Sequence, residues 1–375
     1  MTDTLPDLID SIRAAAAAHT RLRIRGHGSK DFYGELLQGE VLDTSSHTGI
    51  VSHEPTELVV TARAGTPLVE LEAALAEQGQ CLAFEPPRFG GRGTVGGMVA
   101  TGLSGPSRAS VGGVRDYVLG LQMVNGRAEH LVFGGQVMKN VAGYDLSRLM
   151  VGSLGILGLL TEVSLKVMPL PAAEATLVFE VDQARALEQL HRWGAQPLPL
   201  NASRWEQGDH EPGEVGQLFV RLRGAGAAVD SAITRMTQDL PGQTVDPALA
   251  SADWTACRDQ TLPFFDAAAH PGQALWRLSL PQTAPGLNLL WPQLVEWHGG
   301  LRWLWAPESA AAKLRDLSQA VGGTTMLFRA IEPVKTRASD RFEPLERPLD
   351  QIHTRLKAEF DPANIFNPGR MFRAL

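Results

Sequence analysis

The feature that most limits how this chain can fold is the concentration of glycine in one short stretch. Residues 90–102 read GGRGTVGGMVATG, with six glycines in thirteen positions, and they follow Pro86-Pro87. The two prolines favour an extended approach to the stretch. A hydrophobic core gains nothing from so many positions without side chains, whereas close approach of the backbone to a large planar or phosphorylated ligand requires them. The stretch therefore predicts a ligand-binding loop.

A second glycine turn lies earlier, directly after a predicted strand at residues 22–25, and reads Arg25-Gly26-His27-Gly28-Ser29-Lys30. Consecutive backbone N–H groups in such a turn form a concavity for an anion, and Arg25 or Lys30 could add positive charge. An ordinary turn at the end of a strand is the alternative. The longer stretch lacks both the helix-starting G-x-G-x-x-G with a downstream acidic residue and the G-x-x-x-x-G-K-[ST] motif. A Rossmann site and a P-loop nucleotidase are therefore disfavoured.

Composition divides the chain into two regions. Of 38 glycines, 24 lie at or before Gly158, whereas all eight tryptophans lie between Trp193 and Trp305. The break falls near residues 168–171, where the sequence Met-Pro-Leu-Pro suits a linker. Strand and helix patterns mix in both regions, which predicts an α+β fold. We expect helices at residues 5–18, 66–78, 229–240 and 308–320, strands at 22–25, 57–62, 118–124, 128–133, 159–168, 218–223 and 274–280, and a hairpin turn at Asn125-Gly126.

Charge, cysteine content and hydropathy argue against several classes of protein. A net charge of −7 disfavours a nucleic-acid partner. Cys81 and Cys257 are too few for a disulfide framework or an iron–sulfur or zinc site, so any iron–sulfur cluster must belong to another chain. The acidic start and the lack of a long apolar run predict neither a signal peptide nor a membrane span. We expect a cytoplasmic protein, with peripheral attachment to the inner membrane through partners left open.

Six segments, read in order, resemble the PCMH-type FAD-binding domain of the vanillyl-alcohol-oxidase superfamily. They are RGHGSK, HEPTELV, TVGGMVATG, GGVRDYVLG, GGQVMKNVAGYDLSRLMVGSLGILG and DPANIFNPGRMF. Within the superfamily they are most similar to the FAD-binding subunits of bacterial glycolate oxidases. The resemblance covers about residues 20–170 and 355–375, and the tryptophan-rich middle matches only through WHGGLRW.

This resemblance implies an α+β architecture in three parts. Residues 1–170 would form the FAD-binding domain, with two α/β subdomains at about 1–52 and 53–170. Residues 171–335 would form a second, smaller α+β cap domain. Residues 336–375 would return to the flavin.

The resemblance also implies which residues hold the cofactor, FAD. One set would bind one side of the pyrophosphate through its backbone, a second set would bind the other side and the ribityl chain, and a third would surround the adenosine and the ring. The first set is Gly26, His27, Gly28 and Ser29, and the second set is Thr94, Gly96, Gly97, Thr101 and Ser104. In the third set, Gly152, Ser153 and Gly155 would pack on the FAD, and Thr161 and Val163 would lie beside the adenosine or the ring. Asn367, also in the third set, would lie at the isoalloxazine.

One position bears on how the flavin is attached. Relatives with covalently bound flavin carry histidine where this sequence has Ser29, and the histidine of this loop, His27, lies two positions earlier. The resemblance therefore implies non-covalent FAD.

The sequence contains few candidates for substrate chemistry. Oxidation of a 2-hydroxy acid needs a cation for the carboxylate and a base or metal for the hydroxyl proton. Relatives that oxidise D-lactate or D-2-hydroxyglutarate carry a metal motif like GHxGDGN, which this chain lacks, and we expect no metal. The remaining candidates are His298 within WHGG, Arg329 within LFRA, and Lys139. A packed or capping histidine, a solvated strand arginine and a hairpin end are the respective alternatives.

The predicted function is that of an FAD-binding subunit in a multi-subunit glycolate oxidase or dehydrogenase, inactive alone. Its implied partners are a homologous FAD-linked catalytic subunit, an iron–sulfur subunit and a small 2-hydroxy acid substrate, glycolate or D-lactate. A self-contained FAD-dependent oxidoreductase acting on another alcohol or a sugar lactone is the alternative. A structural subunit without flavin is disfavoured by the intact glycine loops.

Overall fold

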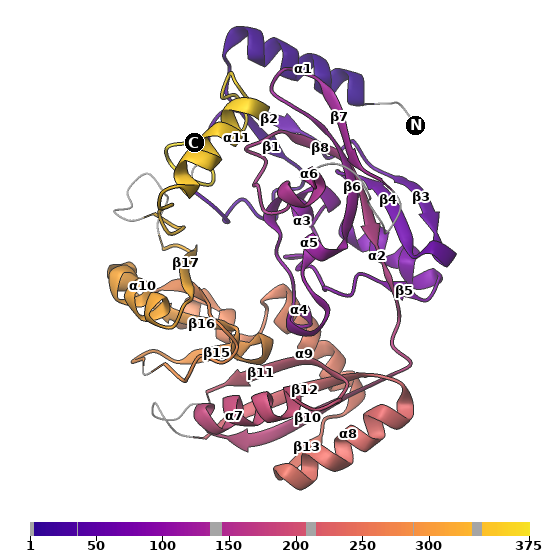
Figure 1. Ribbon diagram of the computed structural model, residues 1–375, viewed down its shortest axis with the longest axis vertical. Helices are drawn as coiled ribbons and strands as arrows, with labels where there is room; N and C mark the ends of the chain where they lie inside the picture. Colours follow the sequence, from indigo (N-terminus) through magenta and orange to yellow (C-terminus); the bar gives the residue numbers. More distant parts are fainter. Residues whose placement is uncertain (1–3, 36, 136–144, 208–214, 288, 332–339) are drawn as a thin grey trace. The chain divides into compact units, whose positions relative to one another are not determined.

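The computed structural model describes residues 4–35, 37–135, 145–207, 215–287, 289–331 and 340–375. Contacts within the chain divide it into two compact units, each built from segments that are distant in sequence. Unit 1 comprises Met1–Leu103, Gly113–Leu170 and Pro344–Leu375, and unit 2 comprises Ser104–Gly112 and Pro171–Glu343. Both units mix helices and strands (Figure 1), which confirms the predicted α+β class.

The first part of unit 1 is a small parallel sheet with its own core. Its elements are helix α1 (Leu5–Ala18) and strands β1 (Leu22–Arg25) and β2 (Glu40–Asp43). Leu8, Ile12 and Ala15 recur at helical spacing along α1 and are buried in this core. Figure 1 shows the yellow C-terminal segment beside the indigo strands β1 and β2. There Ile365 and Phe366, both fully buried, complete the core.

The second part of unit 1 is an antiparallel five-stranded sheet with the order β3-β4-β8-β6-β7. A separate core on this sheet contains side chains from helices α2 and α3. The elements are β3 (Ile50–Glu54), β4 (Val59–Arg63), α2 (Leu68–Glu77), β5 (Gln80–Cys81), α3 (Val95–Thr101), α5 (Val114–Tyr117), β6 (Val118–Val124), β7 (His130–Gly134), α6 (Leu146–Leu149), β8 (Leu159–Lys166), β9 (Met168–Pro169) and α11 (Leu349–Phe360).

The connection between β6 and β7 differs from the two-residue turn that Asn125-Gly126 suggested. The strands pair as a hairpin, but five residues join them, and the positive φ of 59° falls at Ala128. The Asn125 side chain organises this loop, since its Oδ1 accepts from the N–H groups of Arg127 and Glu129 at 2.9 and 3.0 Å. Gly126 serves another purpose, because a Cβ there would lie 2.5 Å from Asp361 Oδ1. The absence of a side chain at Gly126 therefore lets the C-terminal segment pack closely against this loop.

Unit 2 is built on an antiparallel sheet of eight strands with the order β13-β10-β12-β11-β15-β16-β14-β17. Helices α7, α8 and α10 contribute to the apolar cores on this sheet, and α9 contributes polar contacts. The elements are α4 (Arg108–Val111), β10 (Ala173–Val181), α7 (Gln183–Gly194), β11 (Leu200–Glu206), β12 (Gly216–Gly224), α8 (Gly226–Asp239), β13 (Gly242–Thr244), α9 (Pro247–Asp259), β14 (Ala274–Ser279), β15 (Gln293–Glu296), β16 (Leu301–Ala306), α10 (Ala311–Ala320) and β17 (Thr324–Arg329).

Helix α9 lies on a polar face of this sheet. Adjacent residues of a strand point to opposite faces; on β10, Leu177 lies in the apolar core, whereas Thr176 accepts a 2.9 Å hydrogen bond from Trp254 of α9. Arg204, 1% exposed, donates to Asp253 of α9 at 2.7 and 3.1 Å. The face under α9 is therefore filled by paired polar side chains. Within the described part of the chain, no helix is long and apolar enough to cross a membrane.

Candidate functional site

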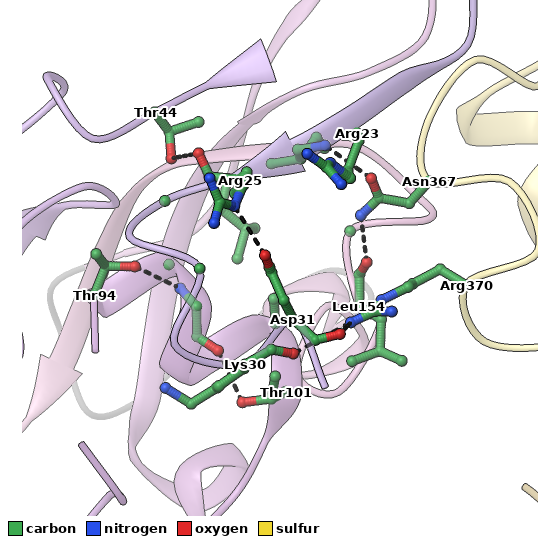
Figure 2. A pocket seen from close by; sticks show the side chains of 18 of the residues that line it. Arg23, Arg25, Lys30, Asp31, Thr44, Thr94, Thr101, Leu154, Asn367 and Arg370 are labelled. Atoms are coloured by element: carbon green, nitrogen blue, oxygen red, sulfur yellow. Dashed lines mark hydrogen bonds and ion pairs between the residues drawn. The ribbon is translucent and has the colours of Figure 1, made fainter. Parts of the chain in front are cut away.

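Unit 1 contains a pocket whose walls come from four segments that are far apart in sequence. It holds about 900 Å³ of non-protein space, open mouth included. The first glycine turn, the start of α3, residues 154–160 and the C-terminal segment all contribute (Figure 2). Eleven predicted cofactor residues line it: Arg25, Gly26, His27, Gly28, Ser29, Thr94, Gly96, Gly97, Thr101, Gly155 and Asn367.

The first glycine turn presents free backbone donors to this pocket. The N–H groups of the four residues 26–29 make no hydrogen bond to any other described residue. Backbone donors left without a protein partner are expected to bind solvent or a ligand. The turn depends on glycine, because Gly28 has a φ of 71° and a Cβ there would lie 2.3 Å from the Arg25 guanidinium. Arg25 in turn is oriented by an ion pair with Asp31 at 3.0 Å.

Helix α3 begins in the second glycine stretch and forms the facing wall. Thr94 caps the helix, since its Oγ1 accepts from the Gly97 N–H at 3.2 Å. A Cβ on Gly97 would have only this oxygen within 4 Å, at 3.1 Å, so position 97 faces open space beside the pocket. Thr101 donates to the Gly97 carbonyl at 2.8 Å and closes the turn. The absence of a side chain at position 97 thus leaves room for a ligand.

The C-terminal segment closes the pocket at Asn367. Its Oδ1 accepts from the Ile24 N–H at 2.8 Å, and its Nδ2 donates to the Leu154 carbonyl at 2.6 Å (Figure 2). A Cβ on Gly155 would lie 2.7 Å from the same Nδ2. Asn367 therefore joins β1, the turn at residues 152–157 and the C-terminal segment.

Arg370 is a pocket residue that the sequence reasoning missed. It is 8% exposed and donates to the carbonyls of Glu35, Lys30 and Asp31 at 3.0, 3.2 and 3.0 Å. Burial lowers its pKa to about 10. The motif NPGR, in which Arg370 follows the turn directly, was the available signal. Lys30, predicted as a possible source of positive charge, also lines the pocket. Other lining residues not predicted are Arg23, Ile24, Asp31, Tyr33, Leu37, Gln38, Thr44, Ala64, Ala100, Leu154, Gly158, Leu159 and Leu160.

Five predicted cofactor residues are not among those that line this pocket. Gly152 and Ser153 line a different pocket with about 510 Å³ of non-protein space, open mouth included, which His353 also lines. Thr161 and Val163 are fully buried in β8. Ser104 belongs to the segment grouped with unit 2.

The candidates for substrate chemistry are each engaged in other contacts. His298 has Ser203 Oγ 2.9 Å from its Nδ1 and Ser110 Oγ 3.0 Å from its Nε2, and burial lowers its pKa to about 4. Arg329 donates to Gln260 Oε1 at 2.9 Å, and burial lowers its pKa as well. Lys139 lies outside the described residues. No group of three metal-binding side chains occurs in the described ranges.

Free N–H groups on a glycine turn, open space beside Gly97 and a returning C-terminal segment are features suited to the pyrophosphate of a dinucleotide cofactor. Comparison with known proteins identifies that cofactor. The FAD binding domain family matches residues 2–134. Over 370 residues the chain is 44% identical to the glycolate oxidase protein GlcE of Escherichia coli (strain K12), covering 98% of this chain and 97% of that protein.

Other relatives share less of the sequence. The chain is 26% identical over 391 residues to a D-lactate dehydrogenase of Archaeoglobus fulgidus, covering 91% of this chain and 85% of that protein. It is 34% identical over 131 residues to glycolate oxidase subunit GlcD of Bacillus subtilis, covering 34% of this chain and 27% of that protein. A solved structure of alkyldihydroxyacetonephosphate synthase has the same fold, with a TM-score of 0.66 at 15% identity over 97% of this chain and 75% of that one.

The chain belongs to the GlcE family of glycolate oxidase subunits, whose FAD-binding domain is of the PCMH type found in the vanillyl-alcohol-oxidase superfamily. It is a flavoprotein oxidoreductase subunit with FAD as its cofactor. The resemblance drawn from the glycine loops and the NPG segment is thereby confirmed.

Proposed function

We propose that this chain is the FAD-binding subunit of a multi-subunit glycolate oxidase that oxidises glycolate or D-lactate to the 2-oxo acid. The observation that carries the proposal is the match to the glycolate oxidase protein GlcE along nearly the whole of both chains. The pocket supports it, because both glycine loops and Asn367 line one hollow with unpaired backbone donors.

The proposed partners are a homologous FAD-linked catalytic subunit and an iron–sulfur subunit. The relative named GlcD supports the first, since it shares part of this sequence and carries the name of another glycolate oxidase subunit. The iron–sulfur subunit is proposed because electrons must leave the flavin for an acceptor. An iron–sulfur cluster is held by four cysteines or a similar ligand set, and this chain has only two cysteines, so the cluster would belong to another chain. Electrons would leave through the cluster of the partner.

FAD supplies the two-electron redox chemistry, and the residues of this chain supply binding and orientation. The N–H groups of residues 26–29 would hold one side of the pyrophosphate, and Gly97 leaves the space for the chain beyond it. Asn367 would fix the wall at the C-terminal segment. His298 is a poor general base at neutral pH, because its pKa is about 4 and both ring nitrogens have serine partners. Proton transfer from the substrate is therefore assigned to the partner subunit.

A second candidate is a self-contained FAD-dependent oxidoreductase, which needs no partner subunit to oxidise its alcohol or sugar-lactone substrate. The observation that favours it is the match to a D-lactate dehydrogenase over 91% of this chain and 85% of that protein. The two candidates differ in what the chain needs in order to turn over substrate.

Co-expression distinguishes them. The tagged chain would be produced with the FAD-linked and iron–sulfur subunits of the same organism, and dye reduction by glycolate would be measured for the purified assembly. We expect co-purification of all three chains and activity that is lost when Gly97→Val blocks the pocket of this chain. An assembly that keeps full activity with the Gly97→Val chain, or a chain that purifies without partners and is active, contradicts the proposal.

A further inference from the structure

Helix α11 carries a buried ammonium group that no cofactor-binding motif includes. Lys357 is 5% exposed, and its Nζ lies 2.7 Å from Asp361 Oδ2, 2.7 Å from the Ile156 carbonyl oxygen and 2.8 Å from the Phe366 carbonyl oxygen. An ammonium group has three donors, so each of them has an acceptor within the protein.

The two carbonyl groups belong to the two segments that close the FAD pocket. Ile156 follows Leu154 and Gly155, which line the pocket. Phe366 precedes Asn367, which lines it as well. Asp361 would by itself be a sufficient partner for the Lys357 charge. The two further hydrogen bonds, to the carbonyl groups of Ile156 and Phe366, therefore fix the distance between the two pocket walls.

Asp361 completes the connection to β1. It is 1% exposed, and its carboxylate accepts from the N–H groups of Ile365 and Phe366 at 3.1 and 2.8 Å. The carbonyl of Ile365 accepts from the Leu22 N–H at 2.7 Å, and the Asn367 N–H donates to the Leu22 carbonyl at 2.9 Å. The segment 361–367 is therefore held along β1, the strand that runs into the first glycine turn.

We propose that Lys357 is a positioning residue for the FAD site, setting the separation between the turn at residues 152–157 and the C-terminal segment. This inference rests on the proposed binding of FAD in the pocket of unit 1. Without the ammonium group the two carbonyls lose their common donor, and Asn367 can no longer hold both Ile24 and Leu154. The pocket wall then loosens although no residue in contact with FAD has changed.

A purely structural buried ion pair predicts a different outcome. Removing one partner of a buried pair is destabilising because it leaves the other charge uncompensated, and removing both charges relieves that cost. Lys357→Met isolates Asp361, whereas the double variant Lys357→Met with Asp361→Asn removes both charges. Stability should therefore recover in the double variant on either view, but only a positioning role of Lys357 and its partner Asp361 predicts that FAD binding stays weak.

The experiment measures the urea midpoint of the apoprotein, the dissociation constant of FAD by flavin fluorescence, and amide hydrogen exchange at Ile24. We expect Lys357→Met to lower the midpoint and weaken FAD binding. The double variant should recover most of the urea midpoint that Lys357→Met loses. It should still bind FAD at least tenfold more weakly than the wild type and lose exchange protection at the Ile24 amide. Arg204→Met, which removes the buried partner of an ion pair in unit 2, is the control and should lower the midpoint with less than a twofold change in FAD affinity.

A double variant with FAD affinity within twofold of the wild type and a protected Ile24 amide overturns the positioning role. If the wild-type chain itself binds no FAD, the proposed function fails instead. The exchange of the Ile24 amide in the apoprotein still decides the role of Lys357 in that case. Should the double variant not fold, Lys357→Gln serves in its place with the same readouts and the same criteria.

Discussion

Gly96 and Gly97 are adjacent in helix α3, yet a methyl group would meet different surroundings at each position. At Gly96 it would lie 2.8 Å from the Ala64 Cβ and 3.1 Å from the Ala64 carbonyl oxygen. At Gly97 it would meet only Thr94 Oγ1, at 3.1 Å. The first glycine allows α3 to pack against the end of β4, and the second leaves the pocket open. Both were predicted to face the cofactor for the same reason, and only the neighbouring atoms separate their roles.

The two positions give a matched pair of variants. We expect Gly97→Ala to keep or raise the stability of the apoprotein, because alanine favours a helix by up to about 1 kcal/mol over glycine, and to weaken FAD binding at least tenfold. Gly96→Ala should lower stability by about 1–3 kcal/mol through overpacking against backbone. Urea unfolding of the apoproteins and flavin titration measure both effects. Full FAD occupancy in Gly97→Ala would show that the loop is wrongly assigned.

The attachment of the flavin also depends on single residues of the first turn. Ser29 occupies the position where covalent relatives carry histidine, and a serine hydroxyl at this site offers no imidazole nitrogen for a flavin bond. We expect acid precipitation of the purified protein to leave the yellow colour in the supernatant. Flavin that stays in the pellet would show a covalent bond, and His27→Ala would then test whether His27 forms it.

Sequence reasoning located the pocket because its evidence is local. A glycine turn after a strand and a stretch crowded with glycine can be read from neighbouring residues, and eleven of the predicted residues line the hollow. Arg370 was missed although the NPGR motif was a local signal for it. Lys357 could not be found in this way, because two of its three acceptors are carbonyl groups brought to it by the fold. Gly126 was misjudged for the same reason, since the atom that excludes its Cβ belongs to Asp361.

At the level of elements, the hydrophobic pattern predicted helices and strands whose buried residues recur at regular spacing. It missed elements that depend on capping residues or on pairing with distant segments. The helix at residues 5–18 and the strands at 22–25 and 118–124 are confirmed with their ends. Helix α3 was not predicted, because two glycines in seven residues argue against a helix. Thr94 at its start and Gly102 at its end, with φ of 62°, supply the caps that allow it.

The turn at residues 297–299 is an element whose stability should depend on pH. Trp297 and His298 both have a φ of 55°, and the imidazole of His298 holds Ser203 and Ser110 in its neutral form. Its pKa of about 4 lies below the ordinary 6.5, so the unfolded chain takes up a proton first as the pH falls. Stability should therefore be lost between about pH 6.5 and 4, by up to about 3 kcal/mol.

Urea midpoints at pH 7 and pH 4.5 measure this loss. The comparison with His298→Gln isolates it from other titrating groups, because glutamine keeps polar contacts and takes up no proton. We expect the variant to be less stable than the wild type at pH 7 and to lose less between the two pH values. Equal losses in both proteins would contradict the role assigned to His298.

At the scale of the whole molecule, the described residues include a pocket suited to a cofactor but few side chains available for substrate chemistry. Unit 1 contains a pocket with free donors, whereas the two candidates described in unit 2, His298 and Arg329, are engaged with Ser203, Ser110 and Gln260. On the polar face under helix α9, Arg204 is paired with Asp253 of that helix. This imbalance agrees with the proposed role of the chain as the FAD-binding subunit of an assembly, and the sequence could suggest it only through the absence of a metal motif.

The isolated chain should therefore bind FAD and fail to oxidise its substrate. Positioned acid–base groups contribute about 10²–10⁴-fold to such reactions, and an FAD-loaded chain without them should turn over glycolate and D-lactate at least a hundredfold more slowly than the assembly. The measurement is dye reduction per bound flavin, with the co-expressed complex as the reference. Chemical reduction with dithionite provides the control, because it must bleach the flavin of the isolated chain and show that the cofactor is redox-competent. Glycolate oxidation by the isolated chain at the rate of the complex would return Arg329, His298 and Lys139 to the position of catalytic candidates.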